Sequence, residues 1–275
     1  MIRGLYTAVS GMVNGLRMQE TVAENIANLG TPGYKGERSG TQEFAGVLAR
    51  SVGTSSSPVP LATERVIGRI GTGAYVDERE TILTEGVERR TDLPLDVMIR
   101  GDGFFQIQTD DGLRFTRDGH MGRDANNTLV TADGQVILGA GGGPITLNTD
   151  DVRILENGEL LVTTEIDVVQ PDGTLATEVT EEIVGQLAVV QIAAEDLVRS
   201  GGSRFTLVPG AGTEAITLGE DAVIVQGALE ETNVDLAHAS TDLMSIARVY
   251  TTNQQVFTAL NDSLQLAVRD IGRVG

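Results

Sequence analysis

The two ends of the chain carry one hydrophobic repeat, and its middle carries another. In the first 29 residues, apolar side chains recur at spacings of three and four, the heptad pattern of a helix that packs along a seam. We therefore expect a long N-terminal helix. Its N-terminal seam consists of Ile2, Leu5, Val9, Met12, Leu16, Gln19, Ala23 and Ile26.

The last part of the chain repeats the same device. Asn233 is the expected N-cap of a second long helix, with Asp235 in the first turn beside the positive helix end. The C-terminal seam consists of Asn233, Leu243, Ile246, Tyr250, Asn253, Phe257, Leu260, Leu264, Ala267 and Ile271. Each seam has a polar member among its apolar positions, Gln19 in the first and Asn253 in the second.

The stretch ENIANLGTPGYK (24–35) ends the first helix. Gly30 can take the left-handed conformation beyond the last turn, and Pro32 cannot continue the hydrogen-bond ladder. The sequence therefore predicts that the chain leaves the helix between Asn28 and Gly33.

The middle of the chain changes to short β-type runs. Asp-Gly pairs at 102–103, 111–112, 118–119, 133–134 and 172–173 and an Asn-Gly pair at 157–158 separate these runs. Such pairs tolerate the positive φ angles of tight hairpin turns, so they predict an antiparallel, all-β domain.

The predicted fold is mainly β with terminal helices: N- and C-terminal α-helices form a coiled-coil domain around an inserted antiparallel β domain. We expect residues 1–35 and 229–275 to form the helical domain and 81–228 the β domain. We expect residues 36–80 to form an extended linker. Within it, SVGTSSSPVPLA (51–62) is predicted to be extended or mobile, and IGTGAYV (70–76) could start the β body.

Two interpretations of the helical seams remain open. Tyr6, Val13 and Val22 widen the apolar face of the N-terminal helix beyond what one partner helix covers. The two helices can form a hairpin packed on the domain body, or their stripes can meet other subunits. In the second case Gln19 and Asn253 would help to fix the register, although a satisfied polar contact at the edge is equally allowed.

Charge and composition narrow the function classes. Residues 51–228 hold 12 basic and 29 acidic side chains, which is most of the net charge of −19. Such a surface repels nucleic acid and anionic lipid, so neither is an expected partner. The start of the chain has no apolar run typical of a cleaved signal peptide, and no segment is apolar enough to span a membrane. We expect a protein that stays in the cytoplasm or leaves by a route that reads no such signal.

No pattern of catalytic or metal-binding residues stands out. The chain has no cysteine, and its two histidines, His120 and His238, have no ligand partners at the right spacing. GAGGGP (139–144) leads to a strand, whereas a phosphate-binding loop needs a following helix. Asp118 and Asp124 lie in a segment that only loosely resembles a calcium loop. We expect no enzyme, no cofactor and no metal site; the rival readings are a calcium-dependent β-rich binding or adhesin module and a β-rich hydrolase.

Three stretches together resemble the bacterial flagellar rod and hook protein family. The first is ENIANLGTPGYK, similar to a helix ending of that family through Ala27, Asn28, Thr31, Gly33, Tyr34 and Lys35, here called the helix-end motif. The second is LDVMIRGDGFFQIQ with LRFTRDGHMGRDANNTLVTADGQVILG, similar to the core of the family's β domain. The third, GALEETNVDLAHASTDLMSIARVYTTNQQVF, is similar to the start of its C-terminal helix.

The resemblance implies an axial structural subunit of the flagellum, exported through the flagellar type III apparatus into the periplasm-spanning basal body. It implies terminal helices that become ordered against neighbouring subunits in an inner tube, with the β domain outside. The expected partners are copies of the chain itself, adjacent rod and hook subunits, the export apparatus and surrounding ring proteins. The interval between Lys35 and Asp96 resembles the distal-rod type, with the proximal-rod type as the alternative.

Overall fold

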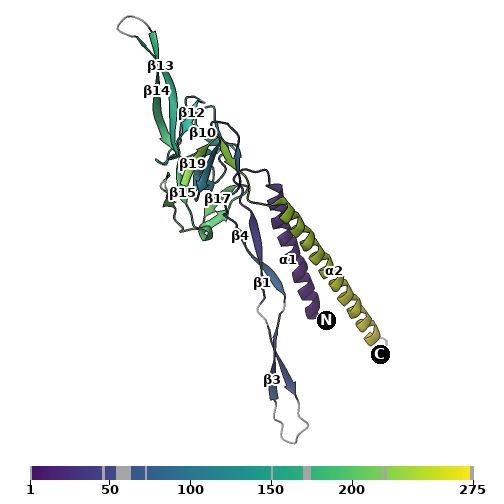
Figure 1. Ribbon diagram of the computed structural model, residues 1–275. Helices are drawn as coiled ribbons and strands as arrows, with labels where there is room; N and C mark the ends of the chain where they lie inside the picture. The colour runs from purple at the N-terminus through teal and green to yellow at the C-terminus, as the bar shows by residue number, and fades with distance from the viewer. Residues whose placement is uncertain are drawn as a thin grey trace. The chain divides into compact units, whose positions relative to one another are not determined.

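The structure, a computed structural model, describes residues 2–44, 47–53, 63–71, 73–149, 151–169, 175–216, 218–219 and 222–272 (Figure 1). The chain divides into two compact units, each assembled from separate segments. The first comprises residues 1–26, 37–81 and 235–275, and the second comprises residues 27–36 and 82–234. This division differs from the predicted one: residues 27–36, which hold the helix-end motif, and residues 229–234 belong to the β-rich unit, and residues 37–81 belong to the helical unit.

The first unit contains two long helices, α1 (Ile2–Ala27) and α2 (Leu236–Gly272), which lie side by side (Figure 1). They lie close together at two glycines of α1, Gly4 and Gly11, where an added side chain would collide with α2. A Cβ atom on Gly11 would lie 2.6 Å from Asn253 Nδ2, and one on Gly4 would lie 2.9 Å from Leu260 Cδ1. Neither helix, over the described residues, has an apolar stretch that could cross a membrane.

The first unit also contains two β-ribbons where the sequence predicted a linker. Strand β1 (Glu37–Glu43) pairs antiparallel with β4 (Ala74–Thr81), and β2 (Val47–Gly53) pairs antiparallel with β3 (Thr63–Ile70). The linker prediction for 36–80 was therefore wrong over these strands, and 74–76 belongs to a ribbon of the first unit. Most of the segment 51–62, namely 54–62, lies outside the described residues.

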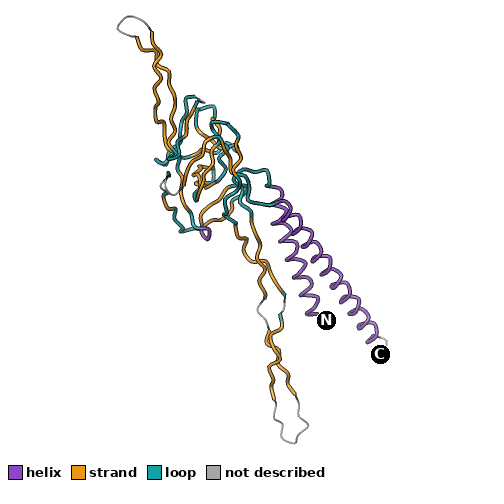
Figure 2. The backbone as a smooth tube through the Cα atoms, in the orientation of Figure 1, coloured by secondary structure: helices purple, strands orange, loops and turns teal. Residues whose placement is uncertain are grey.

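The second unit is the β body, whose strands are drawn in orange in Figure 2 like those of the two ribbons. Its strands are β5 (Glu88–Arg90), β6 (Val97–Gly101), β7 (Phe104–Thr109), β8 (Gly112–Thr116), β9 (Met121–Arg123), β10 (Leu129–Thr131), β11 (Val136–Ile137), β12 (Val152–Ile154), β13 (Glu159–Val169), β14 (Leu175–Gln186), β15 (Val189–Gln191), β16 (Leu197–Arg199), β17 (Arg204–Leu207), β18 (Glu214–Ala215), β19 (Ala222–Gln226) and β20 (Ala228–Glu230), with a 3-10 helix, η1, at Ala194–Asp196. The prediction of a mainly β protein with terminal helices is confirmed.

All pairs between the described strands of the second unit are antiparallel, and an isolated bridge between Leu218 and Ala222 is parallel. The largest sheet runs β16-β17-β8-β7-β11-β10-β9, with β15 also pairing with β7 and with β18. Smaller sheets are β12-β13-β14, β19-β6 and β20-β5. Three of the predicted turn pairs, 111–112, 133–134 and 157–158, join strands that pair with each other. The pairs 102–103 and 118–119 instead connect strands that do not pair, and 172–173 lies outside the described residues.

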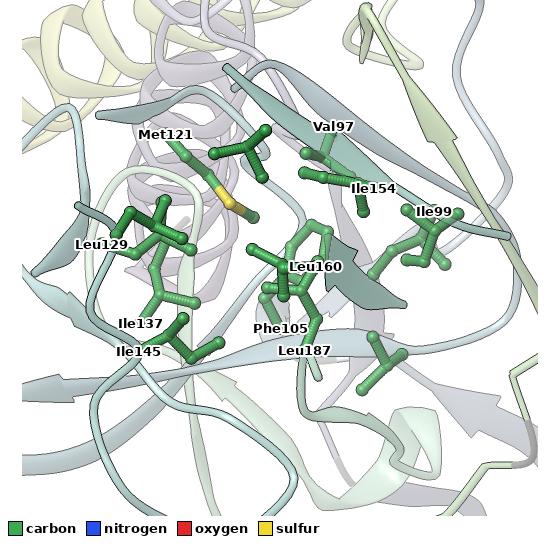
Figure 3. Close-up of a cluster of buried hydrophobic side chains, with 14 of the residues drawn as sticks. Val97, Ile99, Phe105, Met121, Leu129, Ile137, Ile145, Ile154, Leu160 and Leu187 are labelled. Carbon is green, nitrogen blue, oxygen red and sulfur yellow. The ribbon is translucent and has the colours of Figure 1, made fainter. Parts of the chain in front are cut away.

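The core of the second unit lies on both faces of β7. Phe105 and Ile107 enter the larger cluster, whereas Phe104 enters the smaller one with Phe115 and Phe205. Successive strand residues point to opposite faces, so this alternation places β7 between two apolar layers. Figure 3 shows the larger cluster, in which Phe105 lies among aliphatic side chains from several strands.

Candidate assembly surface

The C-terminal seam lies on the face of α2 that contacts α1. Tyr250, Asn253 and Leu260 approach α1 at its glycines, and their stripe is buried or half-buried. The other members on this stripe are Leu243, Ile246, Phe257, Leu264 and Ala267. Ile271 belongs to the backbone of α2, but its side chain lies outside the described residues.

Asn233 is not part of this seam, because α2 begins at Leu236. The N-cap is Asp235, whose Oδ1 accepts hydrogen bonds from the backbone N–H of Ala237 at 2.7 Å and of His238 at 3.2 Å. These bonds stabilise the carboxylate and lower the pKa of Asp235. The prediction of Asn233 as the cap was wrong, since Asp235 stands directly before the first helical residue and satisfies the same orphan donors.

The contact line on α1 is a stripe of small residues that the hydrophobic pattern did not reveal. It comprises Gly4, Ala8, Gly11 and Gly15, and Ala8 is 3% exposed. Small residues let two helix backbones approach closely, and their spacing of four, three and four was the available signal.

The N-terminal seam lies beside this contact line rather than on it. Leu5, Met12, Gln19 and Ile26 are half-buried, whereas Val9, Leu16 and Ala23 are exposed. The side chain of Ile2 lies outside the described residues. The heptad pattern thus located the helix correctly but misplaced the contact face by about one row of side chains.

A third face of α1 is polar and holds the ribbon that follows it. Asn25 Nδ2 donates to the Glu37 carbonyl at 2.7 Å, and the Glu37 N–H donates to Asn25 Oδ1 at 3.0 Å. Thr21 Oγ1 and Ser39 Oγ are 2.7 Å apart. Asn25 and Thr21 are buried, so these bonds fix the register between α1 and β1.

The remaining face of α1 carries uncovered apolar side chains, here called the exposed stripe. It comprises Tyr6, Val9, Val13 and Leu16, with exposures of 71%, 38%, 47% and 46%. Their spacing of three, four and three aligns them along one side of the helix. Full burial of such a side chain contributes roughly 1.5–3 kcal/mol, so four in a row form a surface suited to a partner.

Gly33 explains why the helix-end motif requires a glycine at that point. Its φ is 65°, and a Cβ atom would lie 2.3 Å from the carbonyl carbon of Arg117. Gly30, which was expected to take the left-handed conformation, does not have a positive φ and has open space around its Cα. The reversal therefore occurs three residues later than predicted, where the backbone lies directly against Arg117.

The Lys35 side chain is buried in an ion pair within the second unit. Lys35 Nζ lies 2.6 Å from Glu230 Oε1 and donates to the Thr84 carbonyl at 2.8 Å. Both side chains are 1% exposed, and Arg117 lies 3.4 Å from the other Glu230 oxygen. Burial disfavours the ammonium and lowers the pKa of Lys35, although the Glu230 charge opposes the shift.

The same region joins the residues that follow α1 to those that precede α2. The Gly33 N–H donates to the Glu230 carbonyl at 2.8 Å, and the Gly36 N–H donates to Asn233 Oδ1 at 2.8 Å. Asn233 Nδ2 also donates to the carbonyl of Ile82 at 2.7 Å. Asn233 thus fastens three segments of the second unit, a role that sequence reasoning missed because its partners are distant in the chain.

The other members of the helix-end motif have local roles. Thr31 Oγ1 donates to Asn28 Oδ1 at 3.2 Å, and Tyr34 is 2% exposed beneath the Arg199 guanidinium, which lies 4.4 Å from the ring centre. Ala27 is the last residue of α1. Together these contacts end the helix and anchor the following turn in the β body.

The acidic turn at Asp124, in the segment that loosely resembles a calcium loop, is held by its own hydrogen bonds. Asp124 Oδ1 accepts from the backbone N–H of Thr128 at 2.7 Å and of Asn126 at 2.9 Å. Within the described residues, no three His, Asp or Glu side chains are grouped so that they could hold a metal ion. Asp124 therefore acts as a turn residue, and nothing in this geometry favours the adhesin reading.

Comparison with known proteins finds three family matches in chain order. The flagella basal body rod protein family matches residues 5–35, the flagellar hook protein FlgE/F/G D1 domain matches 98–224, and the flagellar basal body rod FlgEFG protein C-terminal domain matches 225–269.

Whole-length relatives give the same result. Flagellar basal-body rod protein FlgG of Agrobacterium fabrum is 30% identical over 98% of this chain and 100% of its own length. FlgG of Bacillus subtilis is 29% identical over 96% of this chain and 97% of its own length. Flagellar basal-body rod protein FlgF of Rhizobium meliloti is 29% identical over 99% of this chain and 99% of its own length.

Proposed function

The chain belongs to the family of flagellar hook and basal-body rod proteins, and on that premise we propose that its exposed stripe is where copies of it assemble into the rod. The protein is a structural subunit of the flagellar rod, and the distal type is favoured over the proximal type. Its mechanism is mechanical, because many copies packed along their terminal helices form a stiff tube that transmits torque from motor to hook.

The observation that carries this proposal is the face of α1 that the chain itself leaves uncovered. The contact line on α1 meets α2, and the polar face bonds to β1, but Tyr6, Val13 and Leu16 remain 71%, 47% and 46% exposed. Helices of this kind gain most of their stability from packing, so burial of this stripe by another copy would favour polymerisation.

Membership of the family supports the remaining features of the proposal. The protein acts without catalysis, cofactor or metal, and its neighbours are adjacent rod and hook subunits and the rings around the rod. It leaves the cytoplasm through the flagellar export apparatus without a cleaved signal peptide and lies in the periplasm-spanning part of the basal body. The acidic side chains of the middle of the chain suit a solvated surface.

Leu16→Asp tests the assembly surface. We expect this variant to fold but to fail to polymerise and to support no swimming, because a charge would have to be buried between copies. The matched control is Leu113→Asp, which changes a leucine of similar exposure, 41% against 46%, on the β body. Sedimentation of the polymer and a motility assay measure the outcome; normal assembly of Leu16→Asp would contradict the proposed surface.

A further inference from the structure

The exposed aromatic side chains of the chain all belong to the first unit. Of the six phenylalanines and four tyrosines, all of which the structure describes, only Tyr6, Phe44 and Tyr75 are exposed, at 71%, 44% and 39%. The chain has no tryptophan. Aromatic rings are enriched among the side chains that dominate the binding energy of protein interfaces, so the place where they gather is a candidate interaction surface.

Two of the three rings belong to the ribbon of β1 and β4. Phe44 directly follows β1, Tyr75 lies in β4, and their ring centres are 5.3 Å apart. The Tyr75 hydroxyl donates to Gln42 Oε1 at 3.1 Å. Because this bond already satisfies the hydroxyl donor, an apolar partner can cover the ring pair at little cost.

The ribbon contacts α1 at Ser10, which places the ring pair beside the exposed stripe. A Cβ atom on Gly73 would lie 2.5 Å from Ser10 Oγ and 3.1 Å from Phe44 Cδ2, so Ser10 and the Phe44 ring meet at the same glycine. Ser10 follows Tyr6 by four residues and precedes Val13 by three, and residues at these spacings are neighbours on a helix surface. The two elements thus form one surface, here called the aromatic patch, which consists of Tyr6, Val13, Phe44 and Tyr75.

Helix α2 of the same copy does not cover the aromatic patch. It lies close to α1 at Gly4 and Gly11. Tyr6 follows Gly4 by two residues and Val13 follows Gly11 by two, which is a rotation of roughly 200° about the helix axis. The patch is therefore on the opposite side of α1 from α2, and any α2 that covers it belongs to another copy.

Helix α2 carries an exposed row of uncharged side chains beside the face that contacts α1. Thr252 Oγ1 and Ser263 Oγ each donate to a carbonyl of their own helix at 2.8 Å, so neither hydroxyl donor needs water. The members of the row are exposed and recur at spacings of three and four, which aligns them along one side of the helix. The row, here called the α2 row, consists of Val249, Thr252, Val256, Ala259, Ser263 and Leu266.

We propose that the aromatic patch of one copy binds the α2 row of a second copy. The short side chains of the row leave grooves for the larger rings of the patch, and neither surface includes a charged side chain. The patch and the row are different surfaces of one chain, so each copy binds one neighbour through each of them. Such a contact builds an open filament when its rotation does not close a ring. The choice of a second copy rests on the proposed function, to which this contact adds the ribbon and the partner surface.

Cysteine cross-linking tests the contact directly, because the natural chain has no cysteine. Val13→Cys, which keeps all three rings, is combined in turn with Val249→Cys, Val256→Cys and Leu266→Cys, and each assembled protein is treated with a short bismaleimide. We expect at least one pair to give a ladder of covalent multimers on a denaturing gel. Val13→Cys with Leu113→Cys on the β body is the control and should give no ladder.

Phe44→Ser and Tyr75→Ser measure the contribution of the ribbon. Each variant removes an exposed ring, so both should fold, and each should need an about tenfold or more higher concentration to polymerise. Tyr75→Phe loses the bond to Gln42 but keeps the ring, and it should polymerise like the parent. Leu113→Ser is the matched control, because Leu113 is 41% exposed against 39% for Tyr75.

The outcomes separate this contact from the rod assignment. If no cysteine pair gives a ladder, if Val13→Cys alone gives covalent dimers, or if both serine variants polymerise like Leu113→Ser, the proposed contact is wrong. A parent chain that polymerises, together with a Leu16→Asp variant that does not, would still support the proposed function. Failure of the parent chain itself to polymerise would instead count against the proposed function.

Discussion

At the scale of single residues, the most constrained positions of the second unit lie around Glu230. Its carboxylate binds Lys35, the Gly86 N–H at 2.8 Å and Arg117, and all of these partners lie within one unit. Gly33, which tolerates no Cβ atom, donates to its backbone carbonyl. The helix-end motif is thus a folding signal whose partners lie far away in the sequence.

Glu230→Gln should destabilise the second unit by about 3–5 kcal/mol, because it leaves the Lys35 ammonium buried without its counter-charge. The neighbouring Glu231→Gln is the control, since its pair with Arg89 is half-exposed and should contribute about 1 kcal/mol or less. Urea unfolding followed by fluorescence or circular dichroism measures both. Equal losses for the two variants would contradict the assigned role of the buried pair.

Asp118 predicts a specific pH dependence. Burial raises its pKa above the ordinary value of 3.8, so the native state binds more protons than the unfolded state between 3.8 and the native pKa. Its contribution to the free energy of unfolding therefore falls as pH rises through that window. We expect Asp118→Asn to be more stable than the parent at pH 7, with the difference vanishing at acid pH below both pKa values.

Asp124 is the control, because its contribution to stability should depend on pH in the opposite direction. Backbone hydrogen bonds from Thr128 and Asn126 lower the pKa of its carboxyl group, so its contribution is present above pH 3.8 and is lost as pH falls through the native pKa. Asp124→Asn should accordingly lose stability at pH 7. If both variants shift stability in the same direction across the pH series of urea titrations, the account of these two carboxylates is wrong.

At the scale of elements, the sequence predicted both helices. It predicted the contact face of α2 but not that of α1. Leu243, Ile246 and Tyr250 stand on the face of α2 that the apolar pattern indicated. On α1 the pattern selected large residues such as Leu16, whereas Gly4 and Gly11 make the close approach. Apolar periodicity ranks side chains by hydrophobicity, but the distance between two helices depends on which side chains are absent.

The ribbons and the anchoring contacts could not be predicted from the sequence for a related reason. Strands β1 and β4 are rich in polar residues, and Glu37 pairs across the ribbon with Thr81. No local hydrophobic pattern predicts this pairing. Asn25 forms two hydrogen bonds with Glu37, which lies 12 residues away in the sequence, and Lys35 pairs with Glu230, which lies 195 residues away. Local patterns specify turns and periodicity, whereas such pairings are decided by the tertiary fold.

Gly11→Val tests the helix pair. A Cβ atom at this position would meet Asn253, so we expect α1 and α2 to separate locally at a cost of about 1–3 kcal/mol. The control is Thr7→Val on an exposed part of α1, which introduces the same β-branched side chain. Helicity and thermal unfolding by circular dichroism should distinguish the two; indistinguishable curves would mean that the close approach is not a stabilising feature.

At the scale of the whole molecule, the chain combines a β body that buries its own core with a helix that leaves apolar side chains exposed. The β body closes around its own core, and its anchoring residues are buried and paired. Helix α1 is covered on two faces and carries apolar side chains on the other, which is the arrangement expected of a subunit completed by its neighbours. Polymerisation should therefore change the helices far more than the β body.

Amide hydrogen exchange, measured by mass spectrometry on the dilute monomer and on the assembled polymer, tests this claim most directly. We predict that protection of residues 2–27 and 236–270 rises strongly on assembly, while the core strands β6, β7 and β19 exchange equally slowly in both states. Terminal helices that are already as protected in the monomer as in the polymer would contradict the account.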